Sequence, residues 1–331
     1  MKIAIVKLSA LGDIVHAMAV LQFIKKYNQE IEIDWIVEEG YKELLESNPN
    51  ISKVYVVNIK KAKLKKSLVL FLSELKKFYN FKSYDMVIDM QGLVKSAIIA
   101  RLIPSKLTCG FDKYSSRESL AAIFYNKKFN LRYDENVVVR NFELIKFAID
   151  LPYNSDQIIN KKPLLFSNPK YLNTKLSNLK KNIILIPGAS HPSKRYPLEK
   201  FAKLTNLIDA NYIVIWGNKE EKVIAEGIKD LSPNVSVCKK IVLKDLISLV
   251  SLVDLVIGSD TGPTHLAWAQ NVPSITLFGP TPGNRNTYIT KINKIIESSS
   301  KVNPFKINKN DISIKDISVE EIKLVAQSLL V

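Results

Sequence analysis

The segment Asp254-Leu-Val-Ile-Gly-Ser-Asp-Thr-Gly-Pro-Thr-His265 decides the fold of this chain. Residues 253–257 form a short apolar run with β-branched side chains, which is typical of a strand buried on both faces. Residues 258–262 predict a turn, and Pro263 stands where the first residue of a helix belongs. A buried strand that leads through a tight turn into a helix indicates an α/β fold with parallel strands.

The same turn predicts a ligand site. A helix N-terminus leaves backbone N–H groups unpaired, and together with the helix dipole these favour phosphate. Asp260, Thr261 and His265 lie in or beside the turn, and their side chains can hydrogen-bond sugar hydroxyls. Phosphate donors next to hydroxyl-binding side chains predict a nucleotide-sugar site.

Outward from this segment, strand-like apolar runs alternate with amphipathic stretches along the whole chain. The predicted strands are residues 2–6, 31–37, 53–57, 86–89, 182–186, 212–216, 235–237, 253–257 and 274–278. The predicted helices are residues 14–27, a lysine-rich segment before the fourth strand, 198–209, 219–230, 243–251, 263–270 and 319–330. Two such successions predict two doubly wound domains with largely parallel sheets.

The domain boundary is predicted where periodicity weakens. Residues 152–178 are richer in Pro, Asn and Ser, so we expect domains at 1–155 and 179–331 joined by a linker at 156–178. The sequence leaves open whether the final helix, 319–330, packs on the second domain or returns to the first.

Composition narrows the class of protein. The 331 residues carry 48 Lys and Arg against 32 Asp and Glu, a net charge of +16. Such an excess favours a polyanionic partner, although a lysine-rich solvated face is an equally simple reading. No helix-turn-helix, zinc-finger or aromatic RNA-binding motif accompanies the charge, so nucleic acid is not expected. The two cysteines and the absence of a signal-peptide pattern or a long apolar segment predict a reduced, cytoplasmic enzyme.

Ligands of open parallel sheets bind beyond the carboxyl ends of the strands, so the loops there hold the candidate residues. After the first strand, Asp13 falls near a helix start, where it serves either as a helix cap or as a general base. After residue 186, Gly188 and Ser190 offer donors, and Lys194 and Arg195 offer charge for a phosphate. In residues 217–221 an acid serves either as a ligand of ribose hydroxyls or as a residue of a helix start, and residues 279–286 are expected to form another wall of the site. Lys7, Arg117, Arg140 and the lysines near Lys60 are candidates for an anionic acceptor. No cluster has metal spacing, so no metal is expected.

With these residues in place, the chain resembles the lipopolysaccharide heptosyltransferases of glycosyltransferase family 9, most closely those of type I. The motifs that carry the resemblance are residues 7–13, 34–40, 89–96, 116–119, 124–127, 259–265 and 278–281.

The resemblance implies a GT-B-type fold, in which two Rossmann-like domains face one another across a cleft. It also implies inverting, metal-independent transfer of L-glycero-D-manno-heptose from ADP-heptose to the Kdo of Kdo-lipid A, without a cofactor. The acceptor implies a peripheral location on the anionic cytoplasmic face of the inner membrane, and nothing in the sequence requires more than a monomer.

The resemblance assigns roles by position. Asp13 matches the catalytic base, Glu221 or its neighbour Glu220 the ribose ligand, and Ile241 the contact with adenine. The remaining donor-binding positions are Ala189, Ser190, Lys194, Asp260, Thr261, Gly262 and His265. The acceptor-binding positions are Lys7, Lys60, Lys61, Arg117 and Arg140. Two departures stand out: Ala189-Ser190 replaces paired threonines, and Lys60-Lys61 replaces arginines, which gives charge without bidentate geometry.

Two rival functions are considered. One is an enzyme of the same fold with a different donor or acceptor, such as heptosyltransferase II. The other is a non-catalytic binder of anionic lipid, for which Asp13 would be dispensable.

Overall fold

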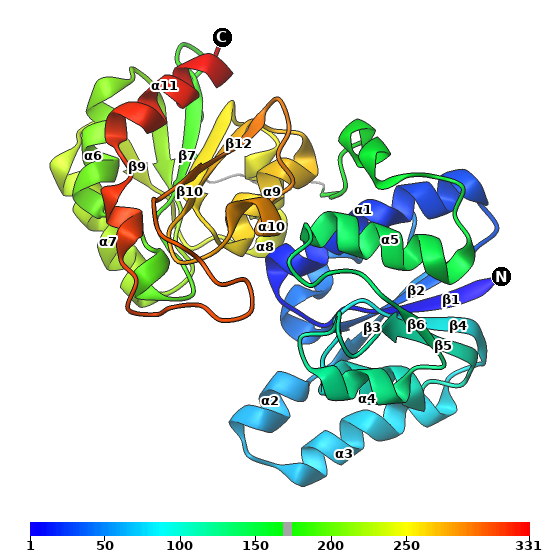
Figure 1. The fold of residues 1–331 in the computed structure, drawn as a ribbon. Helices are drawn as coiled ribbons and strands as arrows, with labels where there is room; N and C mark the ends of the chain where they lie inside the picture. The colour runs from blue at the N-terminus through cyan, green and yellow to red at the C-terminus, as the bar shows by residue number, and fades with distance from the viewer. Residues whose placement is uncertain (168–173) are drawn as a thin grey trace. The chain divides into compact units, whose positions relative to one another are not determined.

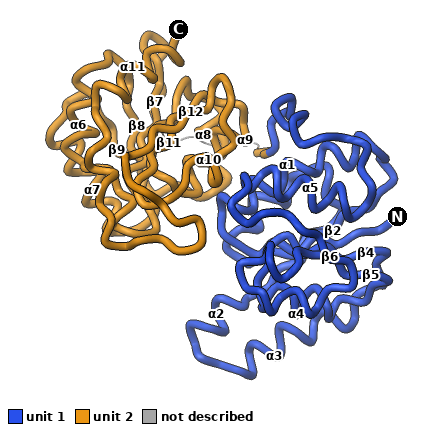
Figure 2. The backbone as a smooth tube through the Cα atoms, in the orientation of Figure 1, with its two compact units in different colours: residues 1–164 blue, residues 165–331 orange. Residues whose placement is uncertain are grey.

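The computed structural model describes residues 1–167 and 174–331, and it divides into two compact units, Met1–Leu164 and Leu165–Val331 (Figures 1 and 2). The division lies inside the stretch expected to be a linker, but residues 155–160 form a short 3-10 helix in which Ile158 is buried. The part of the expected linker at 168–173 lies outside the described residues.

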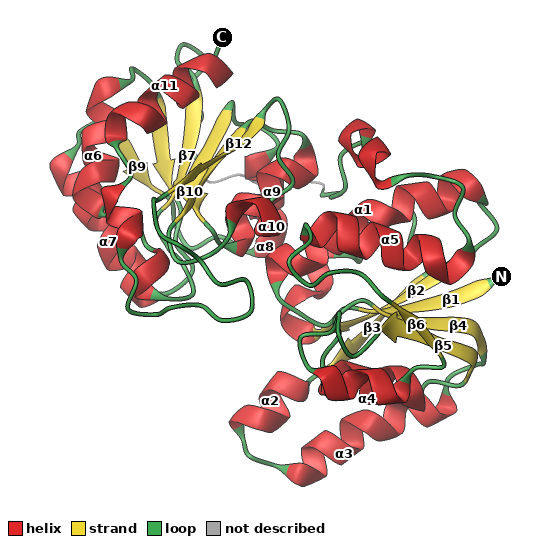
Figure 3. Cartoon of the chain, viewed as in Figure 1, coloured by secondary structure: helices red, strands yellow, loops and turns green. Residues whose placement is uncertain are grey.

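The first unit is built on a parallel six-stranded sheet of order β3-β2-β1-β4-β5-β6. Its strands are β1 (Lys2–Val6), β2 (Glu32–Glu38), β3 (Lys53–Val57), β4 (Tyr84–Asp89), β5 (Ser105–Phe111) and β6 (Lys127–Phe129). Its α-helices are α1 (Leu11–Tyr27), α2 (Ile59–Leu64), α3 (Leu68–Lys76), α4 (Val94–Leu102) and α5 (Val137–Ile149). Helices α1 and α5 cover one face of the sheet, and α2, α3 and α4 lie on the other (Figure 3).

The second unit repeats this plan with a parallel sheet of order β12-β11-β10-β7-β8-β9. Its strands are β7 (Asn182–Ile186), β8 (Asn211–Val214), β9 (Val235–Val237), β10 (Leu255–Ser259), β11 (Ser274–Phe278) and β12 (Asn293–Glu297). Its α-helices are α6 (Leu198–Leu207), α7 (Lys219–Leu231), α8 (Leu243–Val250), α9 (Gly262–Gln270), α10 (Gly283–Asn286) and α11 (Val319–Leu329).

Each unit has its own apolar core, because the central strands are covered on both faces. Val6, Ile36 and Val87 are fully buried in the first unit, as are Leu185 and Ile257 in the second. The predicted doubly wound α/β fold is therefore confirmed. Among the described residues, no helix is long and apolar enough to cross a membrane.

The final helix packs within the second unit. Ile322 and Ala326 of α11 are fully buried in the second core, where α11 contacts α6 and β11. The choice that the sequence left open is thus decided by an apolar stripe on α11 that fits the second sheet.

Two boundaries near the predicted site differ from expectation. Strand β10 runs to Ser259 rather than ending at Ile257, because Gly258 and Ser259 pair with Thr276 and Leu277 of β11. Helix α1 begins at Leu11 rather than at residue 14, which places Asp13 in its first turn.

Candidate active site

The connection from β10 to α9 is tightly packed. A Cβ atom on Gly258 would lie 2.7 Å from Ile186 Cβ and 2.7 Å from Thr264 Oγ1, so only glycine fits without a shift. Thr264 Oγ1 donates to the Ser259 carbonyl at 2.8 Å, and Thr261 is the N-cap residue of α9. The chain is thereby held close as it turns from the strand into the helix, with Asp260 between them.

Asp260 is the centre of the predicted donor turn. Its carboxylate is 7% exposed, and Oδ2 accepts from Lys194 Nζ at 2.6 Å and from Thr281 Oγ1 at 2.9 Å. His265 Nε2 lies 3.3 Å from Oδ1. Burial alone would raise the pKa of Asp260, but the Lys194 and His265 charges and hydrogen bonds hold that pKa well below its usual range. We call these four residues the Asp260 cluster.

The Asp260 cluster joins loops that follow three neighbouring strands, β7, β10 and β11. The sequence placed Lys194 against a diphosphate and Asp260 against sugar hydroxyls, but here the two form an ion pair. A ligand must therefore compete with Asp260 for Lys194, and the pair itself adds no net charge. Thr281 was not singled out from the sequence, although its place just after β11 was a usable signal.

Glu221 lies in the first turn of α7, and its side chain reaches the loops that follow β7 and β8. Its Oε2 accepts from the Gly217 N–H at 2.7 Å, and its Cδ lies 2.5 Å from where a Cβ on Gly188 would stand. Glu220 points elsewhere, because it pairs with Arg195 through contacts of 2.5 and 3.1 Å. Of the two candidates for a ribose ligand, Glu221 alone lies between the two glycine turns.

The other predicted donor residues lie in loops and at a helix start near the same edge of the second sheet. Ala189 is buried and Ser190 is exposed in the loop after β7, while Ile241 is partly buried between β9 and α8. Gly262 and Thr261 lie at the start of α9.

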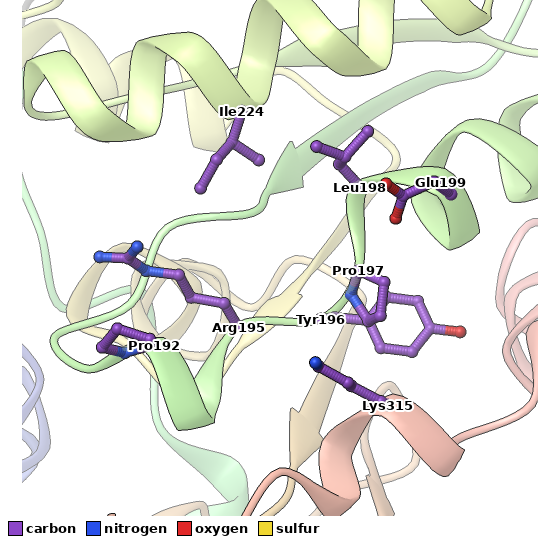
Figure 4. A pocket seen from close by; sticks show the side chains of 8 residues that line it. All are labelled: Pro192, Arg195, Tyr196, Pro197, Leu198, Glu199, Ile224 and Lys315. Carbon is purple, nitrogen blue, oxygen red and sulfur yellow. The ribbon is translucent and has the colours of Figure 1, made fainter.

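A surface pocket of about 420 Å³ includes Arg195, a candidate for phosphate charge that pairs with Glu220 here, and no other residue of its lining was predicted to bind the donor (Figure 4). Its lining residues are Pro192, Arg195, Tyr196, Pro197, Leu198, Glu199, Ile224 and Lys315.

In the first unit, Asp13 is half-buried in the first turn of α1 and its Oδ2 accepts from the Ala10 N–H at 3.1 Å. The preceding loop is fixed by Gln91, whose Oε1 accepts from the Leu8 and Ser9 N–H groups at 3.1 Å each. Gln91 follows β4, the strand beside β1. Sequence patterns predicted no role for Gln91 beyond its place in a matching motif, because a contact across 82 residues leaves no local signal.

The predicted acceptor residues fall into two groups. Lys7 and Arg140 are buried, at 4% and 5% exposure. Lys7 Nζ donates to the Met90 carbonyl at 2.8 Å, and Arg140 donates to the Ser115 carbonyl at 2.7 Å. Arg140 also donates to the carbonyls of the loop after β6, and its guanidinium lies 4.3 Å from the centre of the Phe111 ring. These contacts brace loops at the carboxyl ends of the strands.

The second group is open to solvent. Arg117 is exposed in the loop after β5, and Lys60 and Lys61 are exposed on α2. Among the described residues, no group of three or more His, Cys, Asp or Glu side chains is placed to hold a metal ion.

The fold resembles solved glycosyltransferases over its full length. The Escherichia coli heptosyltransferase WaaC with ADP-2-deoxy-2-fluoro heptose matches with a TM-score of 0.78 and 25% identity, covering 99% of both chains. The same enzyme with ADP matches with a TM-score of 0.80 and 27% identity, covering 99% of this chain and 100% of the other. These matches, together with the site at the strand ends, define a glycosyltransferase of the GT-B type.

Sequence comparisons identify the family. The model of glycosyltransferase family 9 (heptosyltransferase) matches residues 73–312. The lipopolysaccharide heptosyltransferase 1 of Campylobacter coli is 41% identical over 326 residues, covering 94% of each chain. That of Escherichia coli K12 is 29% identical over 290 residues, covering 86% of this chain and 89% of the relative. The chain belongs to glycosyltransferase family 9.

Proposed function

We propose that this protein transfers L-glycero-D-manno-heptose from ADP-heptose to the Kdo of Kdo-lipid A, as a heptosyltransferase of lipopolysaccharide core synthesis. The observation that carries the proposal is the Asp260 cluster beside the N-terminus of α9, in a family 9 chain. Relatives named lipopolysaccharide heptosyltransferase 1, one of them 41% identical, support the choice of donor and acceptor.

The proposed reaction is an inverting displacement with Asp13 as the base. Its Oδ2 is held by the Ala10 N–H, which orients the carboxylate and leaves Oδ1 to take the proton of a Kdo hydroxyl. That hydroxyl oxygen forms a bond to the anomeric carbon of heptose while the bond from that carbon to the ADP oxygen breaks. The proton ends on Asp13, and ADP leaves with the electron pair.

The departing diphosphate needs positive charge in its path. Lys194 and the N-terminus of α9 supply this charge in the proposed mechanism, which assigns no step to a metal ion. When the diphosphate takes Lys194, Asp260 is released to accept hydrogen bonds from heptose hydroxyls, with His265 and Thr261 beside it. Glu221 holds the ribose hydroxyls and Ile241 lies against adenine.

In the first unit, the exposed cations Lys60, Lys61 and Arg117 meet the acceptor's carboxylates and phosphates. The buried Lys7 and Arg140 act on the acceptor through the loops that they brace. An acyl-chain-bearing acceptor places the enzyme on the cytoplasmic face of the inner membrane as a peripheral protein, and a monomer carries all of the residues proposed here.

The test measures ADP release from ADP-heptose by the purified protein, with and without a Kdo-bearing lipid A acceptor. We expect release that requires the acceptor and falls by about 10²–10⁴ in Asp13→Asn. ADP release with GDP- or UDP-sugars instead would preserve the fold but refute the proposed donor. An Asp13→Asn protein that stays folded and turns over normally would refute the base.

A further inference from the structure

Only part of the apolar surface of helix α3 is covered by the first unit. Leu75 is 8% exposed and faces the core of the first unit together with Phe78, which is 1% exposed. Leu68, Val69 and Leu72, in the first two turns of α3, are 69%, 77% and 50% exposed. A helix on the surface of a water-soluble domain normally carries polar residues on its outer face.

The exposed apolar surface continues onto α2 and is bordered by lysines. Leu64, at the end of α2, is 76% exposed. The bordering lysines, all exposed, are Lys60, Lys61, Lys63, Lys65, Lys66, Lys76 and Lys77. Glu74 is the single acidic residue between residues 59 and 80, and it is already paired with Lys77 at 2.7 Å. The exposed side chains of α2 and α3 are therefore almost all apolar or basic.

This surface lies on the side of the sheet that also carries α4, away from α1 and α5 (Figure 1). A basic amphipathic helix with exposed Leu and Val side chains is the pattern of a segment that lies in a membrane interface. The lysines are attracted to anionic headgroups while the apolar side chains leave water. A second copy of this chain fits less well, because a symmetric contact would bring the same lysines against one another.

We propose that the outer surface of α2 and α3 is a membrane-docking surface. Leu64, Leu68, Val69 and Leu72 insert into the interface of an anionic phospholipid bilayer. The bordering lysines other than Lys60 and Lys61, which are assigned to the acceptor, bind its headgroups. The proposal rests on the proposed function in one respect, since a lipid-borne acceptor gives the enzyme a reason to sit on a bilayer.

The experiment measures sedimentation of the purified full chain with vesicles of phosphatidylcholine, alone or with about one-third phosphatidylglycerol. We expect binding to the anionic vesicles that weakens with salt. The variant Leu64→Ser/Leu68→Ser/Val69→Ser is expected to partition at least about 100-fold more weakly, because three apolar side chains stay in water. Lys63→Gln and Lys65→Gln are each expected to weaken binding about fivefold.

The matched control is Val223→Ser/Leu231→Ser/Leu324→Ser, which removes three exposed apolar side chains from the second unit, at 73%, 53% and 68% exposure. It is expected to bind vesicles like the unchanged protein. Equal binding by both triple variants would overturn the proposal, as would binding to neutral vesicles alone. Loss of a dimer in the first variant, with vesicle binding intact, would assign the surface to a second copy and also overturn it.

A second readout separates this proposal from the proposed function. ADP release from ADP-heptose is measured with a Kdo acceptor that lacks acyl chains, so that no membrane is involved. The α2 and α3 variant is expected to retain its activity in this assay while losing vesicle binding. If the unchanged protein binds anionic vesicles but releases no ADP with any acceptor, the docking surface stands and the proposed function fails.

Discussion

Asp260 shows how burial and charge combine at a single residue. Its carboxylate is removed from water, which alone is costly, and Lys194 and His265 offset that cost. The ion pair is therefore a structural contact of the second unit, and in the proposed mechanism its Lys194 also supplies charge to the diphosphate. The structural role of the ion pair can be tested through the stability of the protein and its dependence on pH.

Changing Lys194 to Met is expected to destabilise the protein by about 3 kcal/mol, because it leaves Asp260 buried without its nearest cation. The double variant Lys194→Met/Asp260→Leu is expected to recover most of this loss, and chemical denaturation measures both. A Lys194→Met protein of unchanged stability would show that Asp260 does not depend on the pair.

The same pair predicts a dependence on pH. The folded pKa of Asp260 is lowered, so its stabilising contribution is present above the unfolded pKa of about 3.9 and is lost as the pH falls below it. The free energy of unfolding of the unchanged protein, minus that of Lys194→Met/Asp260→Leu, should therefore decrease as the pH is lowered from 5 toward 2. A difference that grows on acidification would contradict this sign.

Glu221 and Glu220 offer a matched pair of variants. Glu221→Ala is expected to raise the KM for ADP-heptose about tenfold, because the loss of a ribose hydrogen bond costs about 1.4 kcal/mol. Glu220→Ala removes only an exposed pair with Arg195 and is expected to leave the KM unchanged. Steady-state kinetics measure the KM for ADP-heptose in both variants. An equal KM in the two variants would remove Glu221 from the proposed donor site.

At the scale of elements, the β10–α9 connection sets the geometry of the proposed donor site. Gly258→Ala is expected to destabilise the protein by about 2 kcal/mol, because its Cβ would overlap Ile186 and Thr264. Gly40→Ala is the control, since nothing lies within 4 Å of its Cβ position. Thermal unfolding measures both, and equal shifts in Tm would show that the turn tolerates a methyl group.

The elements that sequence patterns missed have a common physical cause. Strand β12 contributes Asn-Lys-Ile-Ile-Glu at a sheet edge, and β6 has three residues, two of them lysine. Strand β5 begins with residues open to water. Such strands are fixed by pairing with a neighbour, so their own residues carry a weak signal. Helices α4 and α5 were not predicted either.

At the scale of the whole molecule, each unit has its own sheet and core. The second unit, residues 165–331, is therefore expected to fold alone and to bind ADP within about tenfold of the full chain, a difference of 1.4 kcal/mol or less. Calorimetry on both proteins tests this. An isolated unit that folds but has no affinity for ADP would place essential donor contacts in the first unit.

The sequence by itself determined the doubly wound α/β class, the family, and the strand ends at which the candidate residues lie. These follow from local periodicity and from motifs such as Ser259-Asp-Thr-Gly-Pro-Thr-His265, which depend only on neighbouring residues. The tertiary structure decided which groups meet: Lys194 with Asp260, Glu221 with Gly188, and Gln91 with the loop before Asp13. It also showed that Lys7 and Arg140 are buried while Leu68 and Val69 of α3 are exposed. These contacts and the burial of each side chain depend on residues distant in sequence, because burial is a property of the packed chain and not of any one segment.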